Sequence, residues 1–223
     1  FETSRGCPFL CAFCDQGLDM SKITTFSTER MSKEIAYVGN KISKINDGTK
    51  KISIFDSNWG MYQKDVDLAY KILDTMNEHN WPEYIECLTP KSNRENLLKI
   101  NDILKNRVAL QLSMQSLNDN VLDLVKRKNW TIDQYLDFLK EIKKRGKSST
   151  SEMIIPLPGA TETSYFEGIK FLMNNGIQPI TYTLMMLCGA EYGRDISKKK
   201  HSLKPMYRVL PKQFGEYKGK RLI

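Results

Sequence analysis

The stretch FETSRGCPFLCAFCDQG, residues 1–17, decides the fold. Three of the five cysteines, Cys7, Cys11 and Cys14, fall within it at a C-x3-C-x2-C spacing, directly after a segment with the character of a strand. Thiolates at such a density bind a soft metal ion or an iron–sulfur cluster. Three cysteines on a four-iron cluster leave one iron without a protein ligand, and that iron is free to bind a substrate or cofactor.

Other interpretations of the three cysteines remain open. A structural zinc site usually has four ligands in two spaced pairs, and the candidates for a fourth ligand are remote in sequence: Cys87, Cys188, His79 and His201. We expect His79 to be a surface residue and Cys87 and Cys188 to be buried thiols. Polar neighbours around the three clustered cysteines argue against ordinary core thiols. We favour a cluster, with a non-enzymatic module that carries a structural zinc ion or an electron-transfer centre as the alternative.

The composition fits a globular protein with one full-sized core. The chain has 223 residues, of which 40% are hydrophobic and 27% charged, which is ordinary for such a domain. No apolar run approaches the roughly 20 residues that span a bilayer. Five cysteines cannot all pair, so we expect a reduced, cytoplasmic protein. The net charge of +8 is spread along the chain, and we expect neither a nucleic-acid nor a membrane partner.

Apolar periodicity predicts alternating strands and helices. After the first strand, the predicted strands are residues 51–55, 84–88, 107–113, 151–157 and 179–187. The predicted helices are residues 31–45, 65–79, 92–104, 118–126, 131–144 and 163–174. Such alternation indicates an α/β fold with a parallel sheet, curled by right-handed crossovers into a barrel or laid out as an open doubly wound sheet. We expect an irregular extension over residues 191–223.

The cysteine spacing, with the aromatic Phe13 before Cys14, resembles the radical S-adenosylmethionine (radical SAM) superfamily, and the resemblance extends through about residue 193. It implies a partial (β/α)6 TIM-like barrel over residues 1–190. It also implies a 4Fe–4S cluster on Cys7, Cys11 and Cys14 whose open iron binds SAM through its amino and carboxylate groups. A reductant such as flavodoxin or ferredoxin then supplies the electron that cleaves SAM, and the resulting 5′-deoxyadenosyl radical abstracts hydrogen from a substrate.

Ligand groups in α/β barrels lie at the carboxyl ends of the strands, and the resemblance assigns several residues there to SAM. Asp56, Ser57 and Asn58 stand where the family contacts the methionine amino group, although the glycine-rich form of that turn is absent and the three residues also suit a turn that caps the next helix. Glu86 stands where a glutamate reaches the cofactor in the coproporphyrinogen-dehydrogenase branch. An exposed edge strand is the alternative for Glu86, because a buried carboxylate needs a partner.

The later strands complete the implied SAM site. Gln115 matches a glutamine that hydrogen-bonds the ribose, and Glu152 matches an aspartate that approaches it. Arg127 falls where an arginine pairs with the methionine carboxylate, a two-pronged interaction that lysine does not reproduce. A plain basic helix end is the alternative for Arg127. Ile154 and Ile155 are candidates for the floor of the adenine pocket.

The opening residues 3–8 also resemble radical SAM members that carry an upstream cobalamin-binding domain. Many of these catalyse methylations or rearrangements in natural-product or surface-glycan pathways. The resemblance therefore extends the expected cofactors to cobalamin, held by a domain outside this sequence, and the expected substrates to small molecules, glycans and natural products. Because the sequence starts without Met and enters a strand at once, we expect it to be a fragment of a longer protein. The sequence leaves the substrate and the reaction subclass open.

Overall fold

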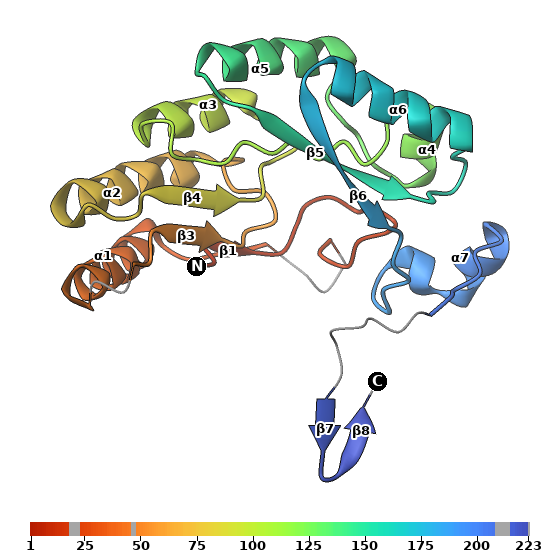
Figure 1. The fold of residues 1–223 in the computed structure, drawn as a ribbon, viewed down its shortest axis with the longest axis horizontal. Coiled ribbons are helices and arrows are strands. Elements are labelled where there is room, and N and C mark those ends of the chain that lie inside the picture. The colour runs from red at the N-terminus through yellow and green to blue at the C-terminus, as the bar shows by residue number, and fades with distance from the viewer. Residues whose placement is uncertain (18–22, 46–47, 208–214, 223) are drawn as a thin grey trace.

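A computed structural model of the chain describes residues 1–17, 23–45, 48–207 and 215–222 (Figure 1). Its strands are β1 (Ser4–Arg5), β2 (Thr24–Thr25), β3 (Lys51–Ile54), β4 (Tyr84–Cys87), β5 (Ser149–Ile155), β6 (Ile177–Thr183), β7 (Gly215–Tyr217) and β8 (Lys220–Leu222). Its helices are α1 (Thr28–Ile45), α2 (Gln63–His79), α3 (Arg94–Ile103), α4 (Asp119–Leu124), α5 (Ile132–Lys144), α6 (Glu162–Asn174), the 3-10 helix η1 (Glu191–Gly193) and α7 (Asp195–Lys200).

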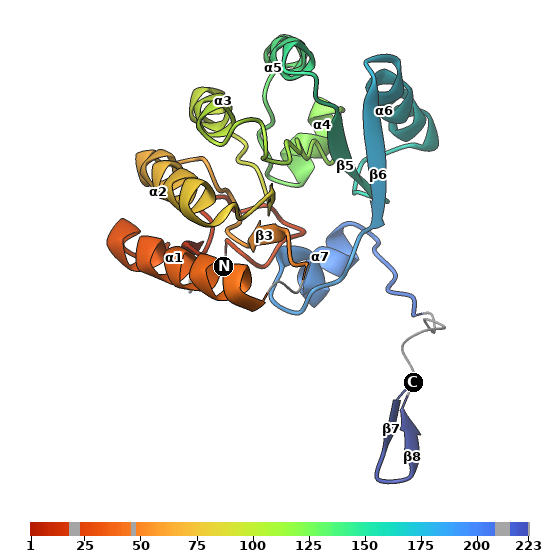
Figure 2. The ribbon, with the colours of Figure 1, turned by 60° about the vertical axis from the view of Figure 1, so that its left-hand side comes forward.

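Two parallel strand pairs form the two sides of an open arc. Strand β3 pairs with β4 from Lys51↔Tyr84 to Ile54↔Cys87, and β5 pairs with β6 over seven residues. Figure 2 shows that the two pairs do not close into a ring, while helices α1, α2, α3, α5 and α6 cover the outside of the arc. The predicted α/β partial barrel with parallel strands is confirmed.

Residues 107–115 join the two sides of the arc, but not as the continuous strand that the sequence predicts. Single parallel bridges connect Val108 to Ile85 of β4, and Gln111 and Gln115 to β5. The segment thus starts against one strand and ends against the other. Because it crosses the gap between two splayed strands, it never makes the run of ladder hydrogen bonds that defines a regular strand.

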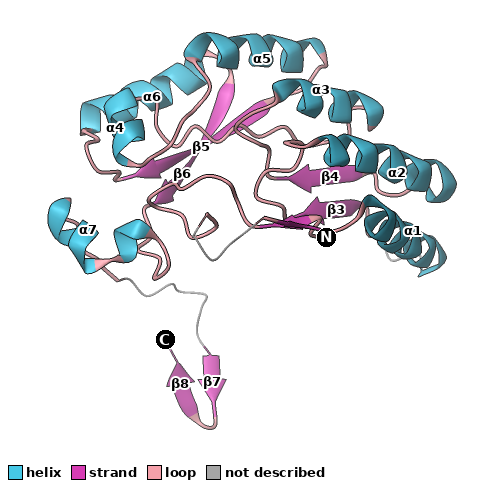
Figure 3. Cartoon of the chain, turned by 180° about the vertical axis from the view of Figure 1, so that it is seen from behind, coloured by secondary structure: helices cyan, strands magenta, loops and turns pink. Residues whose placement is uncertain are grey.

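The core lies between the strands and the outer helices, and the cartoon from behind shows the helices outside the strands (Figure 3). Successive residues of a strand face opposite sides of the sheet, so Ile52, Ile54 and Ile85 are buried against the helices while their neighbours face the inside of the arc. Helices α2, α3 and α5 contribute Ile72, Ile100 and Phe138, among others. Burial of this apolar face is what fixes the helices to the outside.

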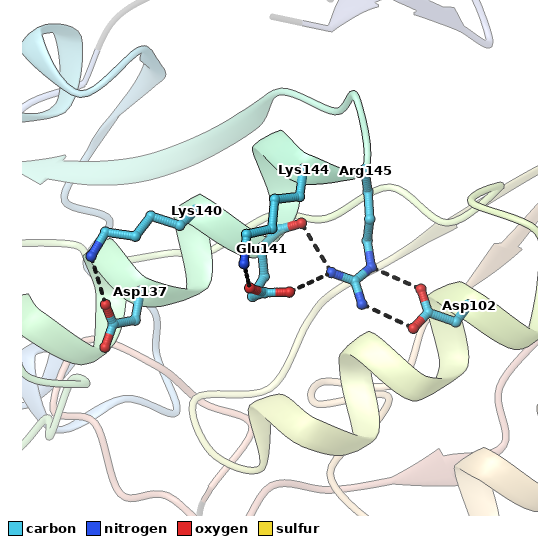
Figure 4. A network of polar contacts seen from close by, with 6 residues as sticks. All are labelled: Asp102, Asp137, Lys140, Glu141, Lys144 and Arg145. Carbon is cyan, nitrogen blue, oxygen red and sulfur yellow. Dashed lines mark hydrogen bonds and ion pairs between the residues drawn. The ribbon is translucent and has the colours of Figure 1, made fainter.

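A network of charged side chains ties α5 to α3 on the outside of the barrel (Figure 4). The Arg145 guanidinium forms two hydrogen bonds with Asp102 of α3, at 2.8 and 2.9 Å, and a third with Glu141 one turn earlier. The hydrogen bonds from Arg145 lower the pKa of Asp102. Asp102 is exposed and Arg145 and Glu141 are half-buried, so each of these ion pairs adds only modestly to stability.

The N-terminal segment is held by the end of β3, which is the first of the parallel strands, and by the buried carboxylate of Asp56. Strand β1 pairs antiparallel with β2, whereas the sequence predicts that the first strand belongs to the parallel sheet. Residue 1 supplies the connection to the barrel, since the Phe55 amide donates to the Phe1 carbonyl at 2.8 Å. The Asp56 carboxylate, 1% exposed, accepts three hydrogen bonds of 2.5 Å from the Thr3 amide, the Thr3 hydroxyl and the Ser4 hydroxyl.

The cysteine loop, residues 7–14, follows β1 and has little regular structure of its own. It is held through Ala12, whose amide donates to the Val125 carbonyl at 3.0 Å and whose carbonyl accepts from the Tyr192 amide at 3.0 Å. Gly17 closes the loop so tightly that a Cβ there would lie 1.7 Å from the Phe9 carbonyl oxygen. The loop is therefore clamped between the end of α4 and η1.

Tyr192 of η1 is the hydrophobic part of this clamp. Its side chain is fully buried in a small cluster with Ala12, Val121 and Val125. Burial raises the pKa of Tyr192 to about 12, so the hydroxyl stays protonated and donates to the Leu124 carbonyl at 2.8 Å. Residues just beyond position 190, where the sequence suggests a boundary, thus pack directly on the cysteine loop.

The remaining C-terminal segment is described only in part. Helix α7 continues from η1, and β7 and β8 form an antiparallel hairpin. Residues 208–214 and 223 of the predicted extension lie outside the described residues. Within the described part of the chain, no helix has the length and apolar character needed to cross a membrane.

We predict that Asp56→Ala lowers the free energy of unfolding of the metal-free protein by about 2–4 kcal/mol, because it leaves buried donors on Thr3 and Ser4 without an acceptor. The matched control is Asp102→Ala, which breaks an exposed ion pair and should cost about 1 kcal/mol or less. Urea unfolding followed by circular dichroism measures both. Equal losses in the two variants would contradict the anchoring role of Asp56.

We predict that Tyr192→Ala loosens the cysteine loop, because removal of a buried aromatic side chain costs about 3–5 kcal/mol locally. In the metal-free protein, the buried Cys11 thiol should then react with a thiol reagent at least about tenfold faster, since its protection depends on local opening. The control is Tyr207→Ala, at a side chain that is 95% exposed, which should leave the rate unchanged. A Cys11 rate that is the same in both variants would refute the clamp.

Candidate functional site

A pocket of about 210 Å³ opens at the carboxyl ends of the strands, beside the cysteine loop. It brings together predicted residues from five separate parts of the sequence. Nine of the predicted site residues line it: Cys7, Cys11, Phe13, Cys14, Ser57, Asn58, Gln115, Arg127 and Glu152. The parallel strands cause this convergence, because their carboxyl ends all meet at one edge of the barrel.

Each of the three cysteine sulfurs has a hydrogen-bond donor of its own. The Asn58 side-chain amide donates to Cys7 Sγ at 3.2 Å, and Lys91 Nζ donates to Cys11 Sγ at 2.9 Å. The backbone of Gln16 hydrogen-bonds to Cys14. Burial raises the pKa of Cys14, and the nearby Cys11 and Cys7 raise it further. Three thiolates so close together repel one another, so the set requires a positively charged group to hold it deprotonated.

Polar side chains from residues 113–115 and β5 also line the pocket. The Glu152 carboxylate accepts from the Ser113 hydroxyl at 2.7 Å and from Gln115 Nε2 at 3.3 Å. Gln115 adopts a left-handed backbone conformation, with φ of +61°. Its side-chain oxygen is buried and finds no donor among the residues that the structure describes. An unsatisfied buried acceptor beside a carboxylate fits a ligand that carries hydroxyl groups.

Arg127 places a buried cation against the cysteines. Its guanidinium, 6% exposed, donates to Asn129 Oδ1 at 2.8 Å and to the Ser113 carbonyl. Asn129 is itself fixed, because its side-chain nitrogen donates to the carbonyls of Met114 and Ser116. Burial lowers the pKa of Arg127, while the charges of Cys11 and Glu152 oppose that shift. The arrangement prepares a rigid positive group for an anionic ligand.

Four predicted site residues lie outside the pocket lining: Asp56, Glu86, Ile154 and Ile155. Asp56 points at Thr3 and Ser4, as described above. Glu86 is exposed on the inner face of the arc, where it pairs with Lys51 at 2.8 Å; this hydrogen bond lowers the pKa of Glu86. Ile154 packs beside the cluster that contains Ala12 and Tyr192.

Lys91 is a pocket residue that the sequence does not predict, and the structure places it against Cys11. The sequence feature that could have pointed to Lys91 was its position just past the end of β4, next to Pro90. Cys87 is buried, as expected, and burial raises its pKa to about 12. Cys188 is exposed, so the expectation of a buried thiol is wrong there, because the strand that was predicted to extend to residue 187 already ends at Thr183.

The donor set fits a cluster better than a single ion. No group of three His, Cys, Asp or Glu side chains converges on one ion position anywhere in the described ranges. A zinc ion requires its ligands to meet at roughly 2.0–2.3 Å from one point, whereas the cysteines of an iron–sulfur cluster bind different irons and stand further apart. Three sulfurs around a pocket that also holds a buried cation and an unpaired acceptor suit a cluster with a ligand beside it.

The family model of the radical SAM superfamily matches residues 1–172. The cobalamin-dependent radical SAM methyltransferase TokK of Streptomyces tokunonensis is 28% identical over 180 residues, which cover 79% of this chain and 26% of TokK. The 2-(S-pantetheinyl)-carbapenam-3-carboxylate methyltransferase of Streptantibioticus cattleyicolor matches with the same identity and coverage. This chain thus spans about a quarter of the length of these curated relatives.

Solved structures show the same fold. The methyltransferase TsrM from Kitasatospora setae, with cobalamin and a 4Fe–4S cluster bound, superimposes with a TM-score of 0.66 at 13% identity, covering 98% of this chain and 42% of TsrM. OxsB, with aqua-cobalamin and SAM bound, gives 0.64 at 16% identity, covering 92% of this chain and 36% of OxsB.

The cysteine spacing, the partial barrel and the pocket at its strand ends all agree with the family match. Members of that family are enzymes that use a 4Fe–4S cluster and SAM. The matched region runs from the first residue to within α6 and includes every cysteine that lines the pocket. This chain belongs to the radical SAM superfamily.

Proposed function

We propose that this chain is the radical SAM part of a methyltransferase that cleaves SAM reductively and acts on a small-molecule substrate. The observation that carries the proposal is that Cys7, Cys11 and Cys14 line one pocket together with Gln115 and Glu152. When bound there, the cluster supplies the electron that splits SAM into methionine and a 5′-deoxyadenosyl radical.

The protein's own residues bind and orient the two groups. Cys7, Cys11 and Cys14 hold the cluster and leave one iron for SAM. Arg127 offers its buried charge to the methionine carboxylate, in keeping with its position beside Cys11. Gln115 and Glu152 present an amide oxygen and a carboxylate to the ribose hydroxyls, and the unpaired Gln115 oxygen supports that role.

The cobalamin-dependent relatives support a methyl transfer that also uses cobalamin. TokK and TsrM are methyltransferases by name, and TsrM binds cobalamin. We propose that a further part of the whole protein holds cobalamin against the open side of this pocket. The substrate is then a small molecule that enters between that part and the barrel, while an external flavodoxin- or ferredoxin-type reductant supplies the electron.

Anaerobic reconstitution with iron and sulfide tests the proposal. We predict about four irons per chain, visible absorbance that changes when SAM is added, and 5′-deoxyadenosine after reduction with dithionite. Alanine substitution of Cys7, Cys11 or Cys14 should abolish the product, whereas Cys188→Ala, at an exposed cysteine outside the pocket, should not. One zinc ion per chain with no visible absorbance would favour a structural metal site instead.

A second prediction concerns Arg127. Arg127→Ala should keep its iron but bind SAM at least about tenfold more weakly, because it removes a charged hydrogen-bond partner worth roughly 1.5–3 kcal/mol. Arg127→Lys should recover only part of the affinity, since an ammonium group does not reproduce the fork of the guanidinium. The control is Arg30→Ala, at an exposed pair with Glu34. Equilibrium dialysis with SAM measures the effect, and unchanged affinity would remove Arg127 from the site.

A further inference from the structure

Lys91 is a pocket cation that the proposed binding of SAM does not use. It lies four residues beyond the end of β4 at Cys87 and follows Pro90, which lies beside Gly60. Its Nζ lies 2.9 Å from Cys11 Sγ and 4.5 Å from the centre of the Phe9 ring. The ammonium group therefore sits between a sulfur and an aromatic face, both of which attract a cation.

Within the described residues, no ion pair joins Lys91 to a carboxylate. The charges that act on it are those of Cys11, Cys7 and Arg127, and Arg127 repels it. Burying a lysine next to an arginine is costly unless an anionic partner compensates. The cysteine sulfurs, which would be anionic when they hold a cluster, are the groups that face it, and Cys11 itself is only 6% exposed.

We propose that Lys91 raises the reduction potential of the cluster through its hydrogen bond to Cys11 Sγ. Hydrogen bonds to the ligand sulfurs and nearby net charge are the protein's means of setting the potential of an iron–sulfur cluster. Reduction adds one electron, taken from an external reductant, and so makes the cluster and its thiolates more negative by one charge. A half-buried ammonium group at hydrogen-bond distance stabilises that more negative state over the oxidised one.

This inference rests on the proposed function, because it requires the cluster on Cys7, Cys11 and Cys14. Lys91 then acts on the cluster through Cys11. Its role differs from the proposed role of Arg127, which is to pair with the SAM carboxylate. Asn58 makes a related contact with Cys7, but as a neutral amide. The charge at Lys91 should therefore have the larger effect on the potential.

The test is a redox titration of the reconstituted protein without SAM, followed by electron paramagnetic resonance of the reduced cluster. At the midpoint potential of the wild type, Lys91→Met should lower the ratio of reduced to oxidised cluster at least about threefold, with iron content unchanged. Lys91→Arg keeps the charge and should stay closer to the wild type. The control is Lys99→Met, which removes the same charge from an exposed position on α3.

An unchanged midpoint in Lys91→Met, or an equal shift in Lys99→Met, would overturn the role of Lys91. Equal loss of iron from Lys91→Met and Lys91→Arg would also overturn it, by showing that the side chain is needed only for packing. A fall in SAM affinity without a change of potential would instead assign Lys91 to the SAM carboxylate and contradict the proposal. A wild type without any four-iron cluster would refute the proposed function itself, which keeps the two failures distinct.

Discussion

The cysteine loop depends on hydrogen bonds that come from outside it. One backbone bond, from the Cys14 amide to the Cys11 carbonyl at 3.0 Å, lies within residues 7–14. The segment is too short and too irregular to fix three sulfurs by itself. The two hydrogen bonds at Ala12 set its position relative to α4 and η1, and Tyr192 fills the space behind it. A site with three ligands on one short, irregular loop needs this external support, since a small displacement of any sulfur changes the metal geometry.

The electrostatics of the pocket follow from that arrangement. Two cations, the half-buried Lys91 and the buried Arg127, lie beside the same sulfur, Cys11, and each makes burial of the other more costly. Such a pair is stable only when negative charge occupies the space between them. A thiolate-bound cluster and a carboxylate ligand supply that charge. The pocket therefore depends on its cofactors for charge balance, and the same charges that bind them also influence how easily an electron enters.

Much of the fold and part of the site could be predicted from the sequence. The spacing of the three cysteines predicts their chemistry. Gln115 and Glu152 reach the pocket because strand ends converge in a parallel barrel, and Arg127 reaches it from the segment that follows α4. Alternation of apolar and polar residues predicts a strand but not which face of the strand each side chain occupies. The sequence therefore does not predict that Glu86 pairs with Lys51 and lies outside the pocket.

Contacts between segments that are far apart in the chain could not be predicted from the sequence. Asp56 has the right residue type at the right strand end, yet the N-terminal segment occupies its carboxylate. No local sequence pattern predicts the contact of Lys91, because its partner Cys11 is 80 residues away. The same holds for the clamp at Tyr192, which joins the last described helices to the first loop. The irregular path of residues 107–115 also depends on the splay between two strands, which no local pattern encodes.

The central claim is that one iron of the cluster has no protein ligand and binds SAM. Mössbauer spectroscopy of protein reconstituted with isotopically enriched iron tests it most directly. Before SAM is added, the irons should give closely similar signals; after addition, one iron should separate from the other three, with the higher coordination that an amino and a carboxylate group impose. A spectrum in which SAM leaves every iron unchanged would contradict the account.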